Sequence, residues 1–183
     1  MKRVPANWTK ASERSPQDLH IFQLRVLEAA DPRDGTLHPR VVLDSPDWVN
    51  VIPVTASGEI VMIRQFRFGT WSVQLEIPGG MVDAGEDPAD AAARELEEET
   101  GYRAGKLLSL GWCHPNPAIL NNKLHCYLAL DCSQHSGASP DDGEDISVEL
   151  YSRADVQRFL REGDITHSAV ITAFFFEQLR GPE

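Results

Sequence analysis

The sequence predicts a mixed α/β (α+β) protein in which many short strands accompany a few helices. Several stretches alternate apolar and polar residues, which is the period of a half-buried strand. Three others carry helix caps or apolar residues at helical spacing: residues 88–100, 154–162 and 168–179. A length of 183 residues with 42% apolar content suits a single globular domain, residues 1–183, with a substantial core.

The chain opens with a polar arm and two strands. Residues 1–18 are polar and mixed, and we expect a loose arm in which Trp8 packs on another surface, for example a second subunit. Residues 19–29 alternate as a half-buried strand does, and residues 40–44 form a second strand. We therefore expect a small antiparallel sheet over about residues 1–45, placed before the main body.

The main body, about residues 46–183, combines strands with helices. Its expected strands cover residues 47–55, 60–66, 72–77, 106–113, 123–131 and 146–151. The helix of residues 88–100 follows Asp87, a good N-cap, and ends at Gly101, which suits the left-handed residue past a helix. The last helix, residues 168–179, is expected to turn five apolar side chains toward the core: Val170, Ile171, Phe174, Phe175 and Leu179.

Composition and charge exclude several classes of protein. The net charge of −11 and the pI of about 4.9 argue against nucleic acid as a partner, because binding to phosphates depends on Lys and Arg. No long apolar run and no signal peptide are seen, so no membrane partner is expected. Cys113, Cys126 and Cys132 form no CxxC pair, and we expect free thiols in a reducing, cytoplasmic compartment, with Cys126 in the core.

The helix of residues 88–100 is expected to present two faces. Small apolar side chains would let one face approach a sheet closely: Ala89, Ala92, Ala93 and Leu96. Glu95, Glu98 and Glu99 share the other face, although like charges at this spacing destabilise a helix by about 0.2–0.5 kcal/mol per pair. A solvated acidic face is the commoner reason for such a run. The alternative is that the carboxylates hold a hard divalent cation such as Mg²⁺, which takes oxygen ligands.

The residues around this helix favour the metal-binding alternative. Nine positions from Gly80 to Tyr102 fit the pattern G-x5-E-x7-R-E-U-x-E-E-x-G-U, in which U is bulky and apolar. At a usage of about 5–7% per residue type, a chance match is on the order of 10⁻⁷. The segment, residues 80–102, resembles the Nudix box without departures. The resemblance implies the Nudix fold, a mixed β-sheet sandwiched between helices, and hydrolysis of a nucleoside diphosphate linked to another group.

Further similarities narrow the resemblance to one subgroup. The opening strands, the run Leu-Glu-Ile-Pro-Gly-Gly at residues 75–80, and Pro117 resemble the ADP-ribose pyrophosphatases and nucleoside diphosphate sugar hydrolases of this family. This implies a homodimer built through the extra N-terminal sheet and a nucleoside diphosphate sugar as small-molecule substrate. After Pro117 the chain departs from typical members, because Asn121 and Asn122 replace an acidic position. Amides bond hydroxyls and phosphates alike, so a specificity broader than ADP-ribose is expected.

The resemblance implies Mg²⁺ as cofactor, with Mn²⁺ able to substitute. The expected ligands are four carboxylates and one main-chain carbonyl, those of Glu86, Glu95, Glu98, Glu99 and Gly79. Glu86 alternatively positions a water beyond the metal ligands. Arg94 precedes Glu97 by three residues and Glu98 by four, so it is expected to orient the acidic face through an ion pair.

Substrate contacts are expected outside the box. The resemblance implies that Arg67 contacts the substrate diphosphate, and arginine suits this role because its planar fork can donate two hydrogen bonds to phosphate oxygens. An ordinary surface arginine is the alternative. The resemblance adds Glu76 as a substrate contact. The loop after the fourth body strand adds Pro117, Asn121 and Asn122.

Two residues are candidates for the general base. Glu98 lies on the metal-binding face of the helix. Glu144 lies in a polar, acidic loop of residues 132–145, and in the resembling enzymes a glutamate of the late acidic loop swings over the diphosphate. We prefer Glu144, because a mobile loop can close over a substrate and reopen for release.

Three functions remain open at this point. The first is a metal-dependent hydrolase that cleaves nucleoside diphosphate sugars such as ADP-ribose or GDP-mannose to a nucleoside monophosphate and a sugar phosphate; a strict ADP-ribose pyrophosphatase is its narrower form. The second is a Nudix sensor that binds a nucleotide without hydrolysis, but such domains usually lose box carboxylates. The third is another Nudix chemistry, such as cleaning of oxidised triphosphates or diphosphate isomerisation, against which the opening strands and Pro117 argue.

Overall fold

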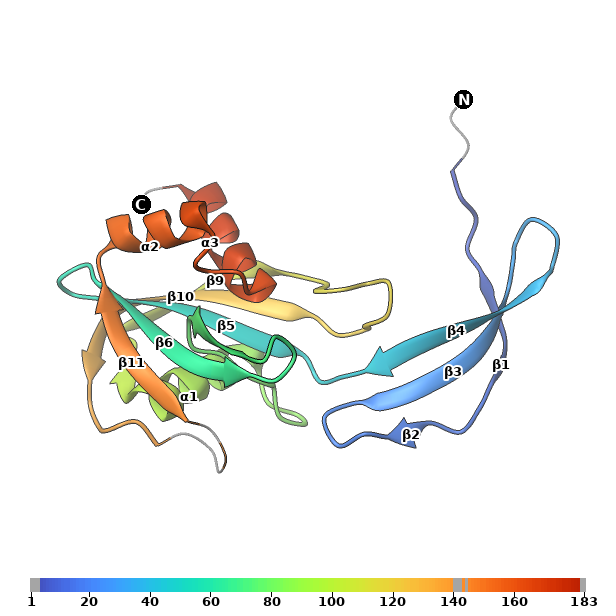
Figure 1. The fold of residues 1–183 in the computed structure, drawn as a ribbon, viewed down its shortest axis with the longest axis horizontal. Coiled ribbons are helices and arrows are strands. Elements are labelled where there is room, and N and C mark those ends of the chain that lie inside the picture. The colour runs from blue at the N-terminus through green and yellow to red at the C-terminus, as the bar shows by residue number, and fades with distance from the viewer. Residues whose placement is uncertain (1–3, 140–142, 144, 182–183) are drawn as a thin grey trace. The chain divides into compact units, whose positions relative to one another are not determined.

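The computed structural model of the chain, drawn in Figure 1, describes residues 4–139, 143 and 145–181. The chain divides into two compact units. The first comprises the residues up to Pro46 together with Asn116–Asn122, and the second comprises Asp47–Pro115 and the residues from Lys123 onward. Whether they act as one catalytic domain with a dimerising N-terminal part stays a prediction.

A four-stranded antiparallel sheet forms the first unit. β3 (Gln23–Ala30) pairs along its whole length with β4 (Leu37–Asp44). Two shorter strands, β1 (Thr9–Glu13) and β2 (Gln17–Asp18), also pair with β3. The expected small antiparallel sheet is therefore present, with more strands than expected.

The loose arm expected for residues 1–18 is wrong where β1 and β2 form. Strand pairing uses main-chain groups, so polar side chains do not prevent it. In addition, the Arg25 guanidinium of β3 binds Glu13 of β1 and, at 3.1 Å, Asp44 of β4. Its hydrogen bond to Glu13 lowers the pKa of that carboxyl to about 2. These ion pairs link the three longest strands of the unit.

The first unit buries few side chains. Trp8 packs on β4, with its ring centroid 5.5 Å from that of His38 and 4.9 Å from the Arg40 guanidinium, yet it remains 43% exposed. Among the described residues of this unit, those that are buried are Ala29, Asp31 and Asn122. The sheet therefore has almost no apolar core of its own.

The second unit is built on a mixed seven-stranded sheet. Its strands are β5 (Trp48–Thr55), β6 (Ile60–Arg67), β7 (Ser72–Glu76), β8 (Tyr102–Arg103), β9 (Lys106–Cys113), β10 (Leu124–Gln134) and β11 (Ile146–Tyr151). β5 and β10 run parallel, and the other pairs are antiparallel. Its helices are α1 (Pro88–Thr100), α2 (Arg153–Glu162) and α3 (Ser168–Arg180). None of the described helices is long and apolar enough to cross a membrane.

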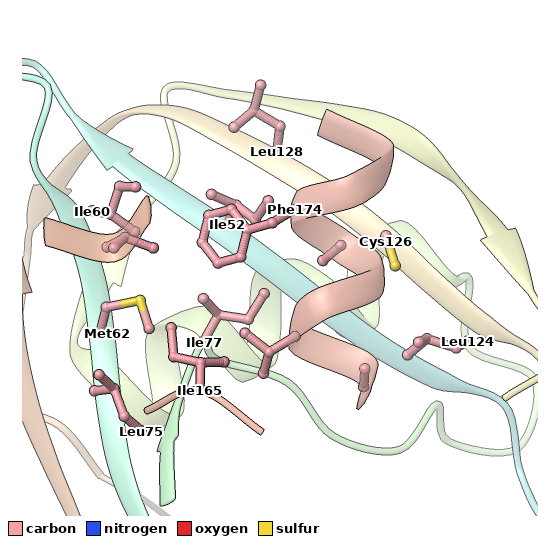
Figure 2. Close-up of a cluster of buried hydrophobic side chains, with 14 residues drawn as sticks. Ile52, Ile60, Met62, Leu75, Ile77, Leu124, Cys126, Leu128, Ile165 and Phe174 are labelled. Atoms are coloured by element: carbon pink, nitrogen blue, oxygen red, sulfur yellow. The ribbon is translucent and has the colours of Figure 1, made fainter. Parts of the chain in front are cut away.

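Helices cover both faces of this sheet (Figure 1). α1 packs on one face, where Ala92 and Leu96 join Val51 in a buried cluster. α2 and α3 cover the other face, where Ile52 and Phe174 belong to a larger core (Figure 2). Successive residues of β5 therefore pack into the cores on opposite faces of the sheet, because side chains alternate along a strand. The predicted mixed sheet between helices is confirmed.

The helical faces were predicted only in part. On α1, Ala93 is exposed and Ala91 is buried instead, because Leu96 and Glu99 set the side that faces the sheet. On α3, Val170 and Phe174 are buried as expected. Three other residues expected in the core are 44%, 55% and 67% exposed, namely Ile171, Phe175 and Leu179. A helix that is apolar on all sides does not specify which side will pack.

The three cysteines are free thiols, as expected. Cys126 belongs to the core on the α3 side, and its burial raises the pKa of its thiol to about 12. Cys132 is buried in the core on the α1 side, and burial raises its pKa to about 11. Both are packing residues with little thiolate character.

Candidate active site

The capping residues define the ends of α1. Asp87 accepts the main-chain N–H of Ala89 at 2.8 Å, and Pro88 takes the first helical position. At the other end, Gly101 has a φ of 75° and donates its N–H to the Glu97 carbonyl at 2.7 Å. Glycine adopts this left-handed conformation at little cost. The caps fix the length of the helix and hence the position of its glutamates.

The buried end of the acidic face is anchored to the preceding loop. Glu99 is 2% exposed, and its carboxylate accepts the N–H of Gly79 at 2.8 Å. A Cβ at Gly79 would lie only 2.2 Å from the Val49 carbonyl oxygen of β5, so a larger residue cannot sit there without a shift. The sequence therefore needs glycine at this position for the loop to pass between β5 and the helix.

Gly80 makes a second close approach. It pairs with Val49 of β5 through two main-chain hydrogen bonds of 2.9 and 3.1 Å. A Cβ at Gly80 would lie 2.4 Å from the nearer carboxylate oxygen of Glu95. The glycine thus leaves room for the Glu95 carboxylate directly beside the loop backbone.

Arg94 lies at the centre of the remaining carboxylates. Its guanidinium binds Glu86 through two hydrogen bonds of 3.0 Å, Glu95 at 2.9 Å and Glu98 at 3.0 Å. It also donates to the Met81 carbonyl at 3.1 Å. The bond from Arg94 lowers the pKa of Glu86, and the same contact raises the pKa of Arg94. The predicted ion pair to Glu98 is confirmed, and Arg94 orders three carboxylates rather than one.

The expected pairing of Arg94 with Glu97 is wrong. Glu97 binds Arg103 of β8 at 2.6 Å instead, and this bond lowers the pKa of Glu97. Arg94 lies three residues before Glu97 in the helix, whereas Arg103 lies six residues after it, beyond the end of the helix. Arg94 is satisfied by Glu86 from the loop, eight residues earlier, a contact that no helical spacing could predict.

These residues fit a hard divalent cation. A cation already occupies the centre of the cluster, in the form of the Arg94 guanidinium. Carboxylate oxygens of three glutamates and the Met81 carbonyl oxygen surround it, and Mg²⁺ prefers oxygen ligands. In the described part of the chain, no three acidic, histidine or cysteine side chains already converge as ligands of one ion. Glu95 and Glu98 would therefore exchange their bonds to Arg94 for bonds to the ion.

Arg67 and Glu76 form an ion pair in the β6–β7 hairpin, in which the glutamate is buried and the arginine is partly exposed. The Arg67 fork donates two hydrogen bonds, of 2.9 and 2.7 Å, to the Glu76 carboxylate. The Glu76 side chain is 2% exposed, whereas the Arg67 side chain is 37% exposed. Both were predicted to contact the substrate. The structure brings them together, with Glu76 fixing the orientation of the fork.

Three predicted substrate residues belong to the first unit: Pro117, Asn121 and Asn122. Asn121 donates to the Asp44 carboxylate and accepts the N–H of Ser45 at 3.3 Å. Asn122 donates its side-chain amide to the Pro46 carbonyl at 3.0 Å. Both amides thus hold the loop of residues 116–122 to the end of β4 and the residues after it. Their part in substrate binding stays a prediction.

Glu144, the preferred base, lies outside the described residues. The described residues before and after it are held to the second unit by main-chain hydrogen bonds. Ser139 donates its N–H to the Glu98 carbonyl of α1 at 2.8 Å, and Ile146 begins β11 opposite Gln65 of β6. The chain on either side of Glu144 is therefore connected to the box helix and to the strand that ends at Arg67.

One residue of the site was not singled out from the sequence. Asn50 is buried in β5, and its side-chain oxygen would lie 2.5 Å from a Cβ at Gly79. It is the one polar residue in the otherwise apolar run of residues 48–54. A polar side chain inside a buried strand was the signal that could have identified it.

The comparisons with known proteins agree with this geometry. A NUDIX domain model matches residues 45–174, which is most of the chain and includes the whole box. An ADP-ribose pyrophosphatase of Bacillus subtilis is 30% identical over 165 residues, covering 87% of this chain and 89% of that protein. A mouse ADP-sugar pyrophosphatase is 36% identical over 117 residues, covering 57% of this chain and 52% of that protein.

A solved structure shows the same fold. The crystal structure of an ADP compounds hydrolase superposes with a TM-score of 0.85 at 23% identity, covering 98% of both chains. Together, the mixed sheet between helices and the carboxylate-bearing box define a Nudix fold with a hydrolytic site. The chain belongs to the NUDIX family, as the match over residues 45–174 shows. It is a pyrophosphohydrolase of that family.

Proposed function

We propose that this enzyme cleaves the diphosphate bond of nucleoside diphosphate sugars, such as ADP-ribose or GDP-mannose. The products are a nucleoside monophosphate and a sugar phosphate. The observation that carries the proposal is the cluster of Glu86, Glu95 and Glu98 around Arg94, beside the Glu99–Gly79 hydrogen bond. The names of relatives, among them an ADP-ribose pyrophosphatase and an ADP-sugar pyrophosphatase, support the substrate class.

Nudix hydrolases generally use divalent metals, and we propose Mg²⁺ here, with Mn²⁺ able to substitute. The residues proposed to hold it are Glu86, Glu95, Glu98, Glu99 and the carbonyl of Gly79. When bound, the ion supplies positive charge for the diphosphate and activates water for attack. Because Glu99 is buried and bonded to the loop, it would fix the spacing between helix and carbonyl, while the more exposed Glu98 remains free to move toward solvent.

Arg67 is proposed to bind the diphosphate. The Glu76 carboxylate accepts hydrogen bonds from two nitrogens of Arg67 and so fixes the orientation of the guanidinium. Because the arginine side chain is already ordered, little conformational entropy is lost when the substrate binds. In this proposal Glu76 acts on the substrate through Arg67. A planar guanidinium can serve a buried carboxylate and a phosphate at different edges, which an ammonium cannot do.

The general base is proposed to be Glu144, with Glu98 as the alternative. Glu98 is 40% exposed on its side chain and shares Arg94 with two other carboxylates. Glu144→Gln should lower kcat by about 10²–10⁴-fold if it is the base, with little change in metal affinity. If the kcat of Glu144→Gln stays within about threefold of the wild type, Glu144 is not the base, and either Glu98 is the base or the metal-activated water needs none.

The loop of residues 116–122 is proposed to contribute to sugar recognition through Pro117, Asn121 and Asn122. The hydrogen bonds of Asn121 to Asp44 and Ser45 would set the course of that loop. A strict ADP-ribose pyrophosphatase is the narrower alternative, and the 30% identity to such an enzyme favours it. A non-hydrolytic sensor is the alternative of another class, and the complete set of box carboxylates disfavours it.

We further propose that the enzyme is a cytoplasmic homodimer. The first unit carries a four-stranded sheet whose described residues bury almost nothing apolar, and such a sheet gains stability by packing on another surface. The three free thiols are consistent with a reducing compartment. Light scattering that finds only a monomer of about 20 kDa at micromolar concentration would contradict the dimer.

A substrate screen tests the function. Sugar nucleotides, dinucleotides and nucleoside triphosphates would be incubated with the enzyme and Mg²⁺, and phosphate would be measured after coupling to a phosphatase. We expect release from nucleoside diphosphate sugars, with the nucleoside monophosphate as one product. Release only from triphosphates, or binding of sugar nucleotides without release, would overturn the proposal.

A further inference from the structure

A cavity lies on the face of the sheet opposite to α1. It has a volume of about 990 Å³ and opens between α2, α3 and the strands beneath them. Its floor is apolar and includes Ile60, Leu128 and Phe174, all of which belong to the core seen in Figure 2. Val156 and Leu160 of α2 complete this apolar wall. The size is at the upper end of the range of small-molecule sites, about 300–1,000 Å³.

The side chains at the mouth of the cavity are apolar and exposed. Ile171 and Phe175 line it from α3, one helical turn apart, and are 44% and 55% exposed. They are two of the residues that the sequence placed in the core. Large apolar side chains left in water beside an apolar cavity indicate a surface that a ligand covers.

The charged side chains that line the cavity are mostly cationic. Among the described residues, Arg153, Arg161 and Arg180 line it together with one carboxylate, that of Glu177. Glu177 is already bound by the fork of Arg153 through two bonds of 2.9 Å. Within the described residues, Arg161 makes no ion pair. A chain with a net charge of −11 thus places an excess of positive charge at one apolar cavity.

We propose that this cavity binds a free amphiphilic anion, namely an acyl chain that ends in a carboxylate. The chain would lie on Leu128, Leu160 and Phe175, and the carboxylate would take the donors of Arg161. The apolar walls suit an acyl chain better than a nucleotide, which needs polar partners for its base and sugar. This site lies on the other side of the sheet from the box, so the inference does not depend on the proposed substrate.

Calorimetric titration with decanoate tests the inference, with decyltrimethylammonium as a probe of equal chain length and opposite charge. Decanoate should bind at one site per chain, and the cationic probe at least tenfold more weakly. Arg161→Ala should weaken decanoate binding about tenfold, the scale of one lost charge-assisted hydrogen bond. Arg158→Ala is the matched control, because Arg158 lies on the same helix but pairs with Asp155 and Glu162.

A blocking variant separates binding from folding. Leu160→Trp should fill the cavity and abolish decanoate binding while sugar-nucleotide hydrolysis at the box continues at the wild-type rate. Equal binding of both probes, no binding of decanoate, or unchanged binding in Arg161→Ala would overturn the inference. A dimer that dissociates in Phe175→Glu during sedimentation would also overturn it, because this face would then be an interface between two copies.

Discussion

α1 and α3 are both 13-residue helices on opposite faces of one sheet, and they use their surfaces in different ways. α1 packs small side chains against the sheet and presents carboxylates beside two tightly packed glycines. α3 packs Val170 and Phe174 and leaves Ile171 and Phe175 exposed around an open cavity. α1 has a side-chain N-cap bond from Asp87, whereas the N-cap of α3 has none.

This difference shows how a single sheet can separate two kinds of chemistry. On the α1 face, close packing and ion pairs place charged groups accurately, as the four bonds of Arg94 to carboxylates show. On the α3 face, loose packing leaves apolar surface and a cationic rim. Accurate placement suits hydrolysis of a charged substrate, and adaptable apolar surface suits binding.

The largest effect is expected for Glu99→Gln on the α1 face. Loss of the buried charge should weaken metal binding and lower turnover by about 10²–10³-fold or more, the range for removing a charge-stabilising group. Glu97→Gln is the matched control on the same helix, because Glu97 binds Arg103 away from the cluster. Kinetics at saturating substrate and varied Mg²⁺ would measure both. Equal turnover of the two variants would contradict the assigned roles.

The two faces of α3 should differ sharply in their contribution to stability. Phe174→Ala removes a buried ring and should lower the free energy of unfolding by about 3–5 kcal/mol. Phe175→Ala, one residue further on, should change it by less than about 0.5 kcal/mol, because that ring is exposed. Urea denaturation measures both. Similar losses would mean that Phe175 is covered in solution.

Arg67→Ala should lower kcat/KM, because a charged hydrogen bond to the diphosphate is lost. The decrease should correspond to a loss of about 2 kcal/mol or more of transition-state stabilisation. Arg67→Lys should recover only part of this, since an ammonium cannot form the fork. The double variant Arg67→Ala/Glu76→Gln removes the buried unpaired carboxylate as well. If it regained full activity, Arg67 would serve only to neutralise Glu76.

The smallest effect is expected from the loop glycines. Gly79→Ala should lower the free energy of unfolding by about 1–3 kcal/mol, because its Cβ would approach the Val49 carbonyl oxygen to 2.2 Å. Gly69→Ala is the control, since its Cβ would have no neighbour within 4 Å. Thermal and urea denaturation would measure both. Equal stabilities would show that the loop can shift without cost.

The parts that the sequence predicted well are those with local causes. The span of α1 followed from Asp87 and Gly101, which act within one turn of the helix. The ion pair of Arg94 with Glu98 followed from their spacing of four residues on the helix. β1 was missed because polar strands owe their pairing to main-chain groups and to a distant ion pair, that of Arg25 with Glu13.

The parts that the sequence could not predict depend on contacts between distant residues. Nothing local showed that Glu86 would bind Arg94, or that Asn50 would lie beside Gly79. The buried side of α3 was equally hidden, because apolar residues surround the helix. The sequence predicted the candidate active site on the α1 side of the sheet, but it did not predict the apolar cavity on the α3 side.

We expect the site on the α1 face to hydrolyse its substrate only with a divalent cation held by the box carboxylates. ADP-ribose hydrolysis in excess EDTA, followed by titration with Mg²⁺, would be measured for the wild type and Glu99→Gln. We expect no hydrolysis in EDTA, full recovery of the wild type with Mg²⁺, and a much higher Mg²⁺ requirement for the variant. Full activity of the wild type in excess EDTA would contradict this expectation.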